Sequence, residues 1–132
     1  MKEVLDSRFL VEHYYSDSKE TKKKTTKRLR DLIQFKEGIV PTIVISETVN
    51  IICEKLGKEE AEICYLDIMT SSLQIQELNS KIAKQAGIIK CQHRNIPMGD
   101  CIIAATAIAN HARILSDDPH LDDIKETKRT WV

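Results

Sequence analysis

The sequence has few aromatic residues and no apolar stretch long enough to cross a membrane. Phe, Trp and Tyr together make up 5% of the 132 residues, so we expect a core built mainly from Ile, Leu, Val and Ala. A transmembrane helix needs roughly 20 apolar residues in a row, and no run approaches that length. A strand-like segment begins within three residues of the start, which leaves no room for a targeting peptide. We therefore expect a cytoplasmic protein without membrane contact.

Paired cysteines and glycine-rich nucleotide motifs are also missing. Cys53, Cys64, Cys91 and Cys101 form no Cys-x-x-Cys pair, which argues against a zinc knuckle. We expect free, buried thiols in a reducing cytosol. Neither GxxxxGK[ST] nor GxGxxG occurs, so no cradle for a nucleotide phosphate is indicated.

The chain has no excess of charge of either sign, but its charge is unevenly distributed. The formal net charge is zero, whereas residues 19–36 alone carry a net charge of +6. Such a window is commonly a solvated helix face, and it can also contact RNA or a protein partner. The side chains that we expect to contact RNA are Lys22, Lys23, Lys24 and Arg28, together with Arg8 outside the window.

The composition that is present is typical of one globular domain. The chain is 42% hydrophobic and 30% charged. A chain of this length buries about two-thirds of its unfolded surface, so we expect residues 1–132 to form a single domain that needs no disulfides.

Hydrophobic periodicity and turn residues predict strands that alternate with helices. Strands are expected over residues 2–6, 39–41, 73–76, 113–116 and 129–132. Helices are expected over 8–16, up to about 37, 43–56, 58–69, 78–93 and 99–111, with 17–24 either a loop or the exposed start of the second helix. Ser7 and Thr42 are the predicted N-caps and Gly38 the predicted helix stop. This alternation predicts an α/β fold with a parallel sheet covered on both faces.

Four acidic residues follow strands or open helices in this arrangement: Asp6, Glu47, Asp100 and Asp118. Each stands beside apolar residues that belong in a core, where an unpaired carboxylate is costly. In parallel sheets, ligands bind at the carboxyl ends of the strands, which gives the four side chains a reason to meet. Mg²⁺ and Mn²⁺ prefer oxygen ligands. The sequence therefore predicts a divalent-metal site.

Other α/β sites with an acid after the first strand fit less well. A haloacid-dehalogenase-type phosphotransferase needs Asp-x-Asp, whereas Asp6-Ser7-Arg8 supplies one acid. A response-regulator receiver needs an acidic pair at the first strand and a lysine near the last, and neither is evident. The histidines are scattered, and His120 is notable only because it stands two residues after Asp118.

Four segments together resemble the PIN domain, a family of metal-dependent ribonucleases that includes VapC-type toxins. They are Val4-Leu5-Asp6-Ser7, Ser46-Glu47, Ile96-Pro97-Met98-Gly99-Asp100-Cys101-Ile102-Ile103-Ala104-Ala105-Thr106-Ala107 and Ile114-Leu115-Ser116-Asp117-Asp118-Pro119-His120-Leu121. The last two are the most specific, and they are similar to the family patterns I-P-x-x-D-x-x-I-A-A-T-A and L-[ST]-x-D-x-H-[FL]. The order and spacing of the segments hold over essentially the whole chain.

The resemblance implies a three-layer α/β/α sandwich with a central parallel sheet. It also implies that Asp6, Glu47, Asp100 and Asp118 are catalytic, with Ser7 and Ser116 in support. Asp6, Asp100 and Asp118 would bind Mg²⁺ or Mn²⁺, and Glu47 would bind the ion or orient the attacking water.

Two positions depart from the family pattern. Arg8 stands where a small residue is usual, and it either pairs with an acid or reaches toward phosphate. Asp117 adds a carboxylate beside Asp118, and it either binds metal or faces solvent.

Taken together, these observations favour a metal-dependent endoribonuclease that acts on RNA. The small size resembles the toxin of a toxin–antitoxin pair, which implies an antitoxin protein that blocks the acidic groove and a homodimer. Two alternatives remain: a stand-alone RNA-processing nuclease of the same family, and a PIN scaffold that binds RNA without cutting it.

Overall fold

Five short strands form one sheet in the order β3-β2-β1-β4-β5, and every neighbouring pair is parallel. The computed structural model describes residues 1–132. The strands are β1 (Glu3–Leu5), β2 (Gly38–Pro41), β3 (Gln74–Gln76), β4 (Arg113–Leu115) and β5 (Arg129–Thr130). At the centre, Val4 pairs with Ile39 on one side and with Ile114 on the other. The predicted parallel sheet is confirmed.

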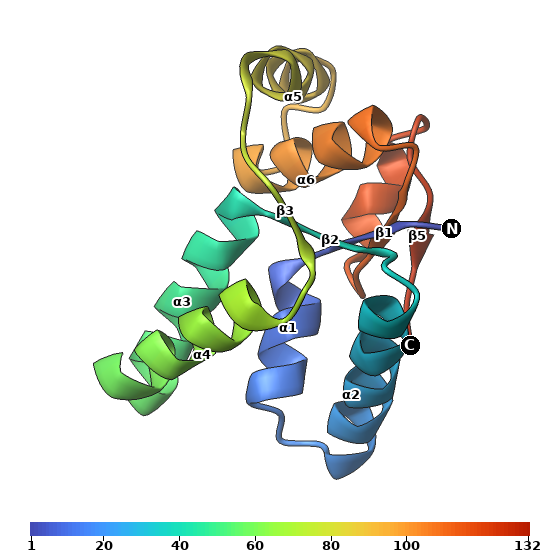
Figure 1. Ribbon diagram of the computed structural model, residues 1–132. Coiled ribbons are helices and arrows are strands. Elements are labelled where there is room, and N and C mark those ends of the chain that lie inside the picture. The colour runs from blue at the N-terminus through green and yellow to red at the C-terminus, as the bar shows by residue number, and fades with distance from the viewer.

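Helices cover both faces of this sheet (Figure 1). They are α1 (Ser7–Tyr14), α2 (Lys19–Gln34), α3 (Thr42–Leu56), α4 (Lys58–Thr70), α5 (Ser80–Gln92) and α6 (Met98–Ala109), with a short 3-10 helix η1 (Pro119–Asp123). The helices α5 and α6 pack together on one face, and α1 to α4 lie on the other. The fold is therefore the expected three-layer α/β/α sandwich.

The core consists almost entirely of aliphatic side chains. Strands β1 and β2 are buried along their whole length, as parallel strands covered on both faces must be. The helix α6 is buried from Cys101 to Ala107, so it contributes an almost wholly apolar segment to the core. Among the few aromatic residues, Phe9 is buried and meets Trp131 edge to face, with 6.1 Å between the ring centroids.

A buried ion-pair network closes the amino-terminal edge of the sheet. Glu3, only 2% exposed, accepts hydrogen bonds from Arg28 at 3.2 Å and from Arg113 at 2.6 Å. These contacts join β1 to α2 and to β4. Glu3 is the buried member of these pairs, and the two guanidinium groups together supply the opposite charge that a buried carboxylate requires.

Several predicted helix boundaries are wrong. The N-cap position of α1 is occupied by Asp6, and that of α3 by Pro41, not by Ser7 and Thr42. Ser18 caps α2 by accepting a hydrogen bond from the Thr21 amide at 3.2 Å, so the exposed helix start is the correct alternative for residues 17–24.

Gly38 belongs to β2 and does not end α2. The helix has already ended at Gln34, and Lys36 adopts a left-handed conformation with φ 55°. A Cβ atom at Gly38 would lie 2.5 Å from the Leu73 side chain, so the glycine serves close packing between the strand and its neighbours.

The expectation for the cysteines is confirmed in part. All four are free, but only Cys64 and Cys101 are buried, whereas Cys53 and Cys91 are exposed. None of the helices combines the length and the apolar character that a membrane span requires.

Candidate metal-dependent active site

The strand order indicates that a ligand would bind between β1 and β4. The chain proceeds outward from β1 through β2 to β3, and it then returns to the other side of β1 to form β4 and β5. Such a reversal opens a crevice at the carboxyl ends of the two central strands. Asp6 directly follows β1, and its amide donates to the Leu115 carbonyl at the end of β4 at 3.2 Å. Asp118 follows β4 after two residues.

Asp6 is the most deeply buried of the four acids, with 2% of its surface exposed. Its Oδ2 accepts a hydrogen bond from Ser116 Oγ at 2.6 Å, and its Oδ1 a longer one from Ser7 Oγ at 3.4 Å. Although Asp6 precedes α1, its side chain does not cap that helix. Burial raises the pKa of Asp6 above its usual range despite these hydrogen bonds. Both predicted supporting serines therefore contact this carboxylate.

Asp118 is fixed by its own neighbours. Its Oδ1 accepts a hydrogen bond from the His120 amide at 3.0 Å and lies 2.8 Å from His120 Nδ1. Its amide donates to Ser116 Oγ at 3.1 Å, so Ser116 links Asp118 to Asp6. Partial burial pushes the pKa of Asp118 upward, but the hydrogen bonds from His120 outweigh it and the pKa is lowered. The sequence singles out His120 only by its spacing, and the structure gives it this orienting contact.

Asp100 and Glu47 complete the group from two helices. Asp100 lies in the first turn of α6, where burial and the charges of Asp6 and Asp118 raise its pKa to about 6. Burial and the charges of Asp6 and Asp100 likewise raise the pKa of Glu47 on α3. The charges of neighbouring acids therefore contribute to the raised pKa of both Asp100 and Glu47, as is expected for carboxylates that lie close together.

Gly99 shapes the site, a role that the sequence alone does not reveal. A Cβ atom at this position would lie 2.9 Å from Glu47 Oε2. Glu47 can therefore rest against the first turn of α6 only because residue 99 has no side chain. The one sequence signal is the glycine directly before Asp100, which by itself indicates no more than a break between two elements.

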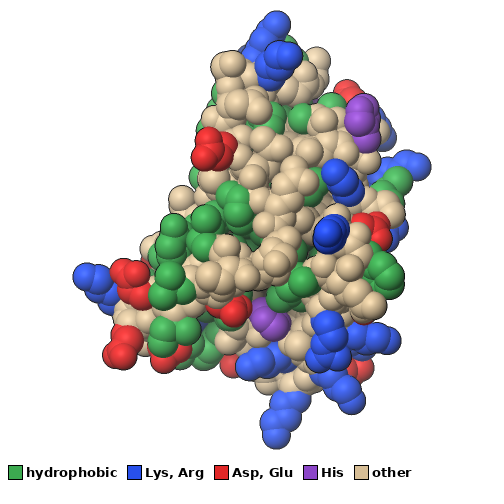
Figure 2. All heavy atoms as spheres, in the orientation of Figure 1, with side chains coloured by type: hydrophobic (Ala, Val, Ile, Leu, Met, Phe, Trp, Pro, Cys, Tyr) green, Lys and Arg blue, Asp and Glu red, His purple; other side chains and the backbone are tan.

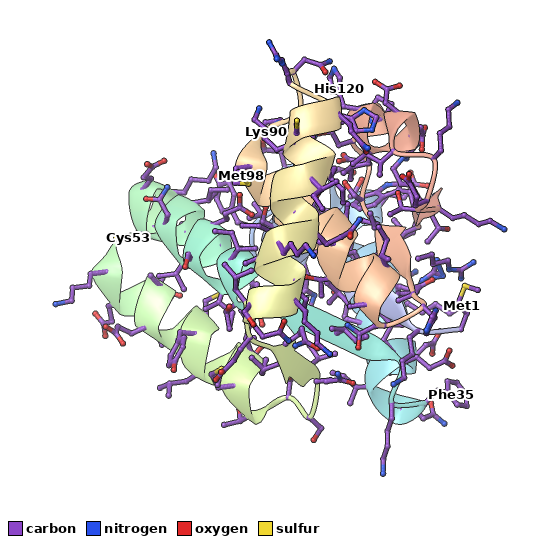
Figure 3. The ribbon with its side chains drawn as sticks, turned by 90° about the horizontal axis from the view of Figure 1, so that it is seen from above. Met1, Phe35, Cys53, Lys90, Met98 and His120 are labelled. Atoms are coloured by element: carbon purple, nitrogen blue, oxygen red, sulfur yellow. The ribbon has the colours of Figure 1, made fainter.

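The loop before Asp100 is held by Lys90 near the end of α5. Its Nζ donates to the carbonyl oxygens of Arg94 at 2.6 Å and Ile96 at 2.8 Å. Figure 3 shows Lys90, Met98 and His120 toward one end of the molecule, and Met1 and Phe35 toward the other side. The segment that presents Asp100 is therefore anchored.

The donor set fits a hard divalent cation. With the side chains in their present positions, no group of three or more His, Cys, Asp or Glu residues could hold a metal ion. However, Glu47 Oε1 is buried without any hydrogen-bond partner, an arrangement that is costly unless another group satisfies it. An incoming cation would supply that partner and would relieve the repulsion that raises the pKa of Glu47 and Asp100. The oxygen-only ligands suit Mg²⁺ or Mn²⁺.

The two residues that depart from the family pattern contact each other. Arg8 Nε donates to Asp117 Oδ1, and both side chains are exposed at the rim of the site. Of the alternatives left open by the sequence, pairing with an acid is therefore what the structure shows for Arg8. Asp117 is engaged with Arg8 and is not a free ligand.

The basic window folds into α2, away from the acids. Lys24 pairs with Glu20 at 3.3 Å, and Arg28 is held by Glu3 at the other edge of the sheet. A hollow of about 450 Å³ on the exposed face is lined instead by Lys19, Lys22, Lys23, Thr26, Lys27 and Arg30. Figure 2 shows lysine and arginine side chains gathered over this helix. We call the five cationic residues of this lining the α2 basic face.

Comparison with known proteins identifies the family. The family model of the PIN domain matches residues 4–127, nearly the whole chain. The chain belongs to the PIN domain family. No curated protein matches it significantly.

Solved structures share the fold of this PIN domain at low sequence identity. VapBC2 from Rickettsia felis, bound to a DNA fragment from its promoter, superposes with a TM-score of 0.80 at 20% identity, covering 99% of this chain and 98% of the other. VapC20 from Mycobacterium tuberculosis, a toxin that cleaves the sarcin–ricin loop, gives 0.73 at 13% identity, with 93% and 95% covered. A toxin–antitoxin complex from Klebsiella pneumoniae gives 0.63 at 14% identity, with 89% and 87% covered.

Proposed function

We propose that this PIN domain is a metal-dependent endoribonuclease. The observation that carries the proposal is the group of four acids at the switch point, in which Glu47 Oε1 is buried without a partner. Asp6, Asp100 and Asp118 would bind Mg²⁺ or Mn²⁺, and Glu47 would bind the ion or orient the attacking water. We leave Asp117 out of this set because Arg8 engages it. The bound cation would lower the pKa of that water and neutralise charge developing on the phosphate.

The chain's own residues prepare the site for this role. Ser116 holds Asp6 by its hydroxyl and accepts from the Asp118 amide, so it fixes two of the acids relative to each other. His120 holds one oxygen of Asp118, and the absence of a side chain at Gly99 leaves room for Glu47. Fixed ligands reduce the ordering that cation binding requires.

A cleavage assay tests the proposal. A 5′-labelled single-stranded RNA is incubated with purified protein in Mn²⁺, in Mg²⁺ and in EDTA. We expect cleavage only with metal, and loss of cleavage in Asp6→Asn. Asp123→Asn, an exposed acid in η1 that makes no hydrogen bond through its side chain, serves as the matched control and should cut like wild type. Cleavage that persists in EDTA, or an Asp6→Asn protein as active as wild type, would refute the metal mechanism.

We also propose that the protein is the toxin of a toxin–antitoxin pair and that it forms a homodimer. Support for the toxin assignment comes from the similar structures, since one of them is a toxin–antitoxin complex and another is a toxin that cleaves the sarcin–ricin loop. The homodimer is proposed by analogy with the family. Expression should then arrest bacterial growth, and Asp6→Asn should relieve the arrest. Sedimentation equilibrium should give twice the 15.1 kDa of one chain. Growth unaffected by wild-type expression would contradict the toxin assignment, and a mass of 15.1 kDa would contradict the dimer.

A further inference from the structure

The contact between Arg8 and Asp117 has no evident purpose in stabilising the fold. Arg8 is the second residue of α1, and Asp117 lies in the loop between Ser116 and Asp118. The Arg8 side chain is 55% exposed and that of Asp117 37% exposed. Exposed ion pairs contribute little to stability, because solvent screens them and the long side chains lose freedom. The buried ion pairs of Glu3, at the opposite edge, have the structural role that this contact lacks.

Arg8 is distinguished by where its charge lies. The positive charge of Arg8 opposes the burial that raises the pKa of Asp6 and Asp100, and it helps to lower the pKa of Asp118, so the guanidinium lies near three of the four acids. Lys90 is the lysine of α5 that is closest to Asp100 in the sequence, but its ammonium group donates to two backbone carbonyl oxygens.

The guanidinium is also held in a way that leaves it free to bind. Its Nε donates to Asp117, whereas neither Nη atom makes a hydrogen bond. Two Nη groups in one plane match two oxygens of a phosphate, and the contact through Nε restricts the plane in which they lie. A cluster of acidic side chains otherwise repels a polyanion, so a cation beside the cluster offsets that repulsion where the backbone of the nucleic acid approaches.

We propose that Arg8 contacts a phosphate of the RNA chain beside the acidic site, and that Asp117 is a positioning residue that orients the Arg8 guanidinium. This inference rests on the proposed function, because it takes RNA as the substrate. Under this proposal Arg8 and Asp117, the two residues that depart from the family pattern, act together in binding the substrate.

The first test measures RNA binding without cleavage. Asp100→Asn and Asp100→Asn/Arg8→Gln are titrated with the same single-stranded RNA over a range of salt concentrations in EDTA. We expect Arg8→Gln to weaken binding about tenfold and to reduce the salt slope by about 0.7, the value for one phosphate contact on a single strand. Lys128→Gln in the same background removes one exposed positive charge near Met1 and Arg113, at the other edge of the sheet, and should leave the slope unchanged.

The second test separates positioning from simple charge. Asp117→Asn removes a negative charge near the substrate, so RNA binding should be unchanged or tighter. If Asp117 orients Arg8, kcat should nevertheless fall while KM does not rise. Arg8→Gln/Asp117→Asn should be no slower than Arg8→Gln alone, because the positioning residue then has nothing to orient. Arg8→Lys, which keeps the charge but not the planar fork, should keep the salt slope and lose part of the rate.

The outcomes distinguish this inference from the proposed function. If wild type cuts RNA but Arg8→Gln binds with the affinity and slope of the Lys128→Gln control, the Arg8 assignment is wrong and the nuclease assignment stands. If wild type cuts under no metal condition, the proposed function fails, and the binding experiment still decides whether Arg8 contacts RNA. Absence of RNA binding by Asp100→Asn, even at low salt, overturns the Arg8 assignment as well.

Discussion

Asp100 is the residue whose ionisation is most clearly coupled to the rest of the site. Its pKa of about 6 lies above the usual 3.8, because burial and the charges of Asp6 and Asp118 disfavour its carboxylate. A raised acid pKa means that the folded state binds more protons than the unfolded state between these two values. Stability of the metal-free protein should therefore fall as pH rises from about 4 to about 6.

Asp100→Asn should remove this loss of stability. Thermal melting in EDTA across that pH range should give a variant that is more stable than wild type at pH 7, with a difference that shrinks toward pH 4. Asn should not remove a helix cap, because the N-cap position of α6 is occupied by Pro97 and no side chain caps this helix. Asp123→Asn, measured in parallel, should show no such trend. A stability difference that is independent of pH would indicate that Asp100 acts only as a helix-start residue.

Gly99 allows a second prediction at the scale of one residue. Alanine is a better helix former than glycine by up to about 1 kcal/mol, so Gly99→Ala should leave the metal-free protein as stable as wild type or slightly more stable. The new Cβ would displace Glu47 Oε2, which lies 2.9 Å away. Stabilisation by Mn²⁺, read as the rise in melting temperature, should therefore be reduced. Gly87→Ala, where a Cβ meets nothing within 4 Å, is the control and should respond to Mn²⁺ like wild type.

Among the elements, α2 offers the clearest functional prediction. No hydrophobic residue lines the hollow on its basic face, which favours a phosphate backbone over a peptide that needs hydrophobic anchors. We expect weaker RNA binding, to the same extent for RNAs of different sequence, in the triple variant Lys22→Gln/Lys23→Gln/Lys27→Gln. The slope of log binding constant against log salt concentration should fall in magnitude by about 0.7 for each phosphate that is no longer neutralised. Lys55→Gln/Lys58→Gln/Lys125→Gln removes the same charge elsewhere and is the control. Equal slopes for the two triple variants would mean that the α2 basic face is only solvated.

The elements also show what could be predicted from the sequence. The alternation of apolar strands and amphipathic helices was sufficient to predict the layers. Each acid stands beside an apolar segment in the sequence, which was sufficient to predict that it follows a strand or opens a helix. Helix starts could not be predicted in the same way. Ser7 offers a hydroxyl suited to capping, but that hydroxyl lies against Asp6, whose own carboxylate is turned to Ser116. Ser116, which binds the Asp6 carboxylate, is distant from Asp6 in the sequence. A prediction based on local propensity therefore assigned the N-cap to the wrong residue.

Long-range contacts likewise changed the interpretation of the charged residues. Lys22, Lys23, Lys24 and Arg28 were equivalent in the sequence, but Arg28 faces inward to Glu3 and Lys24 pairs with Glu20. The pairing of Arg8 with Asp117 and the fit of Glu47 against Gly99 depend on elements that only the fold brings together. Spacing along one segment carries no information about such contacts.

At the scale of the whole molecule, the parallel sheet brings four acids that are far apart in the sequence toward the carboxyl ends of its central strands. Asp6 leaves the central strand, Asp118 follows its neighbour, and Asp100 and Glu47 arrive on helices from opposite faces of the sheet. The fold stabilises this arrangement through its apolar core and through the ion pairs of Glu3 at the far edge. Its carboxyl edge is left with like charges whose mutual repulsion a cation would relieve.

Calorimetric titration of Mn²⁺ into the metal-free protein tests this account most directly. Wild type and Asp123→Asn should bind Mn²⁺ with the same affinity, whereas Glu47→Gln and Asp100→Asn, which lie on different helices, should each weaken binding by more than about tenfold. All four proteins should remain folded by circular dichroism. Binding of Mn²⁺ by Glu47→Gln and Asp100→Asn with the wild-type affinity would contradict the claim that these acids form one cation site.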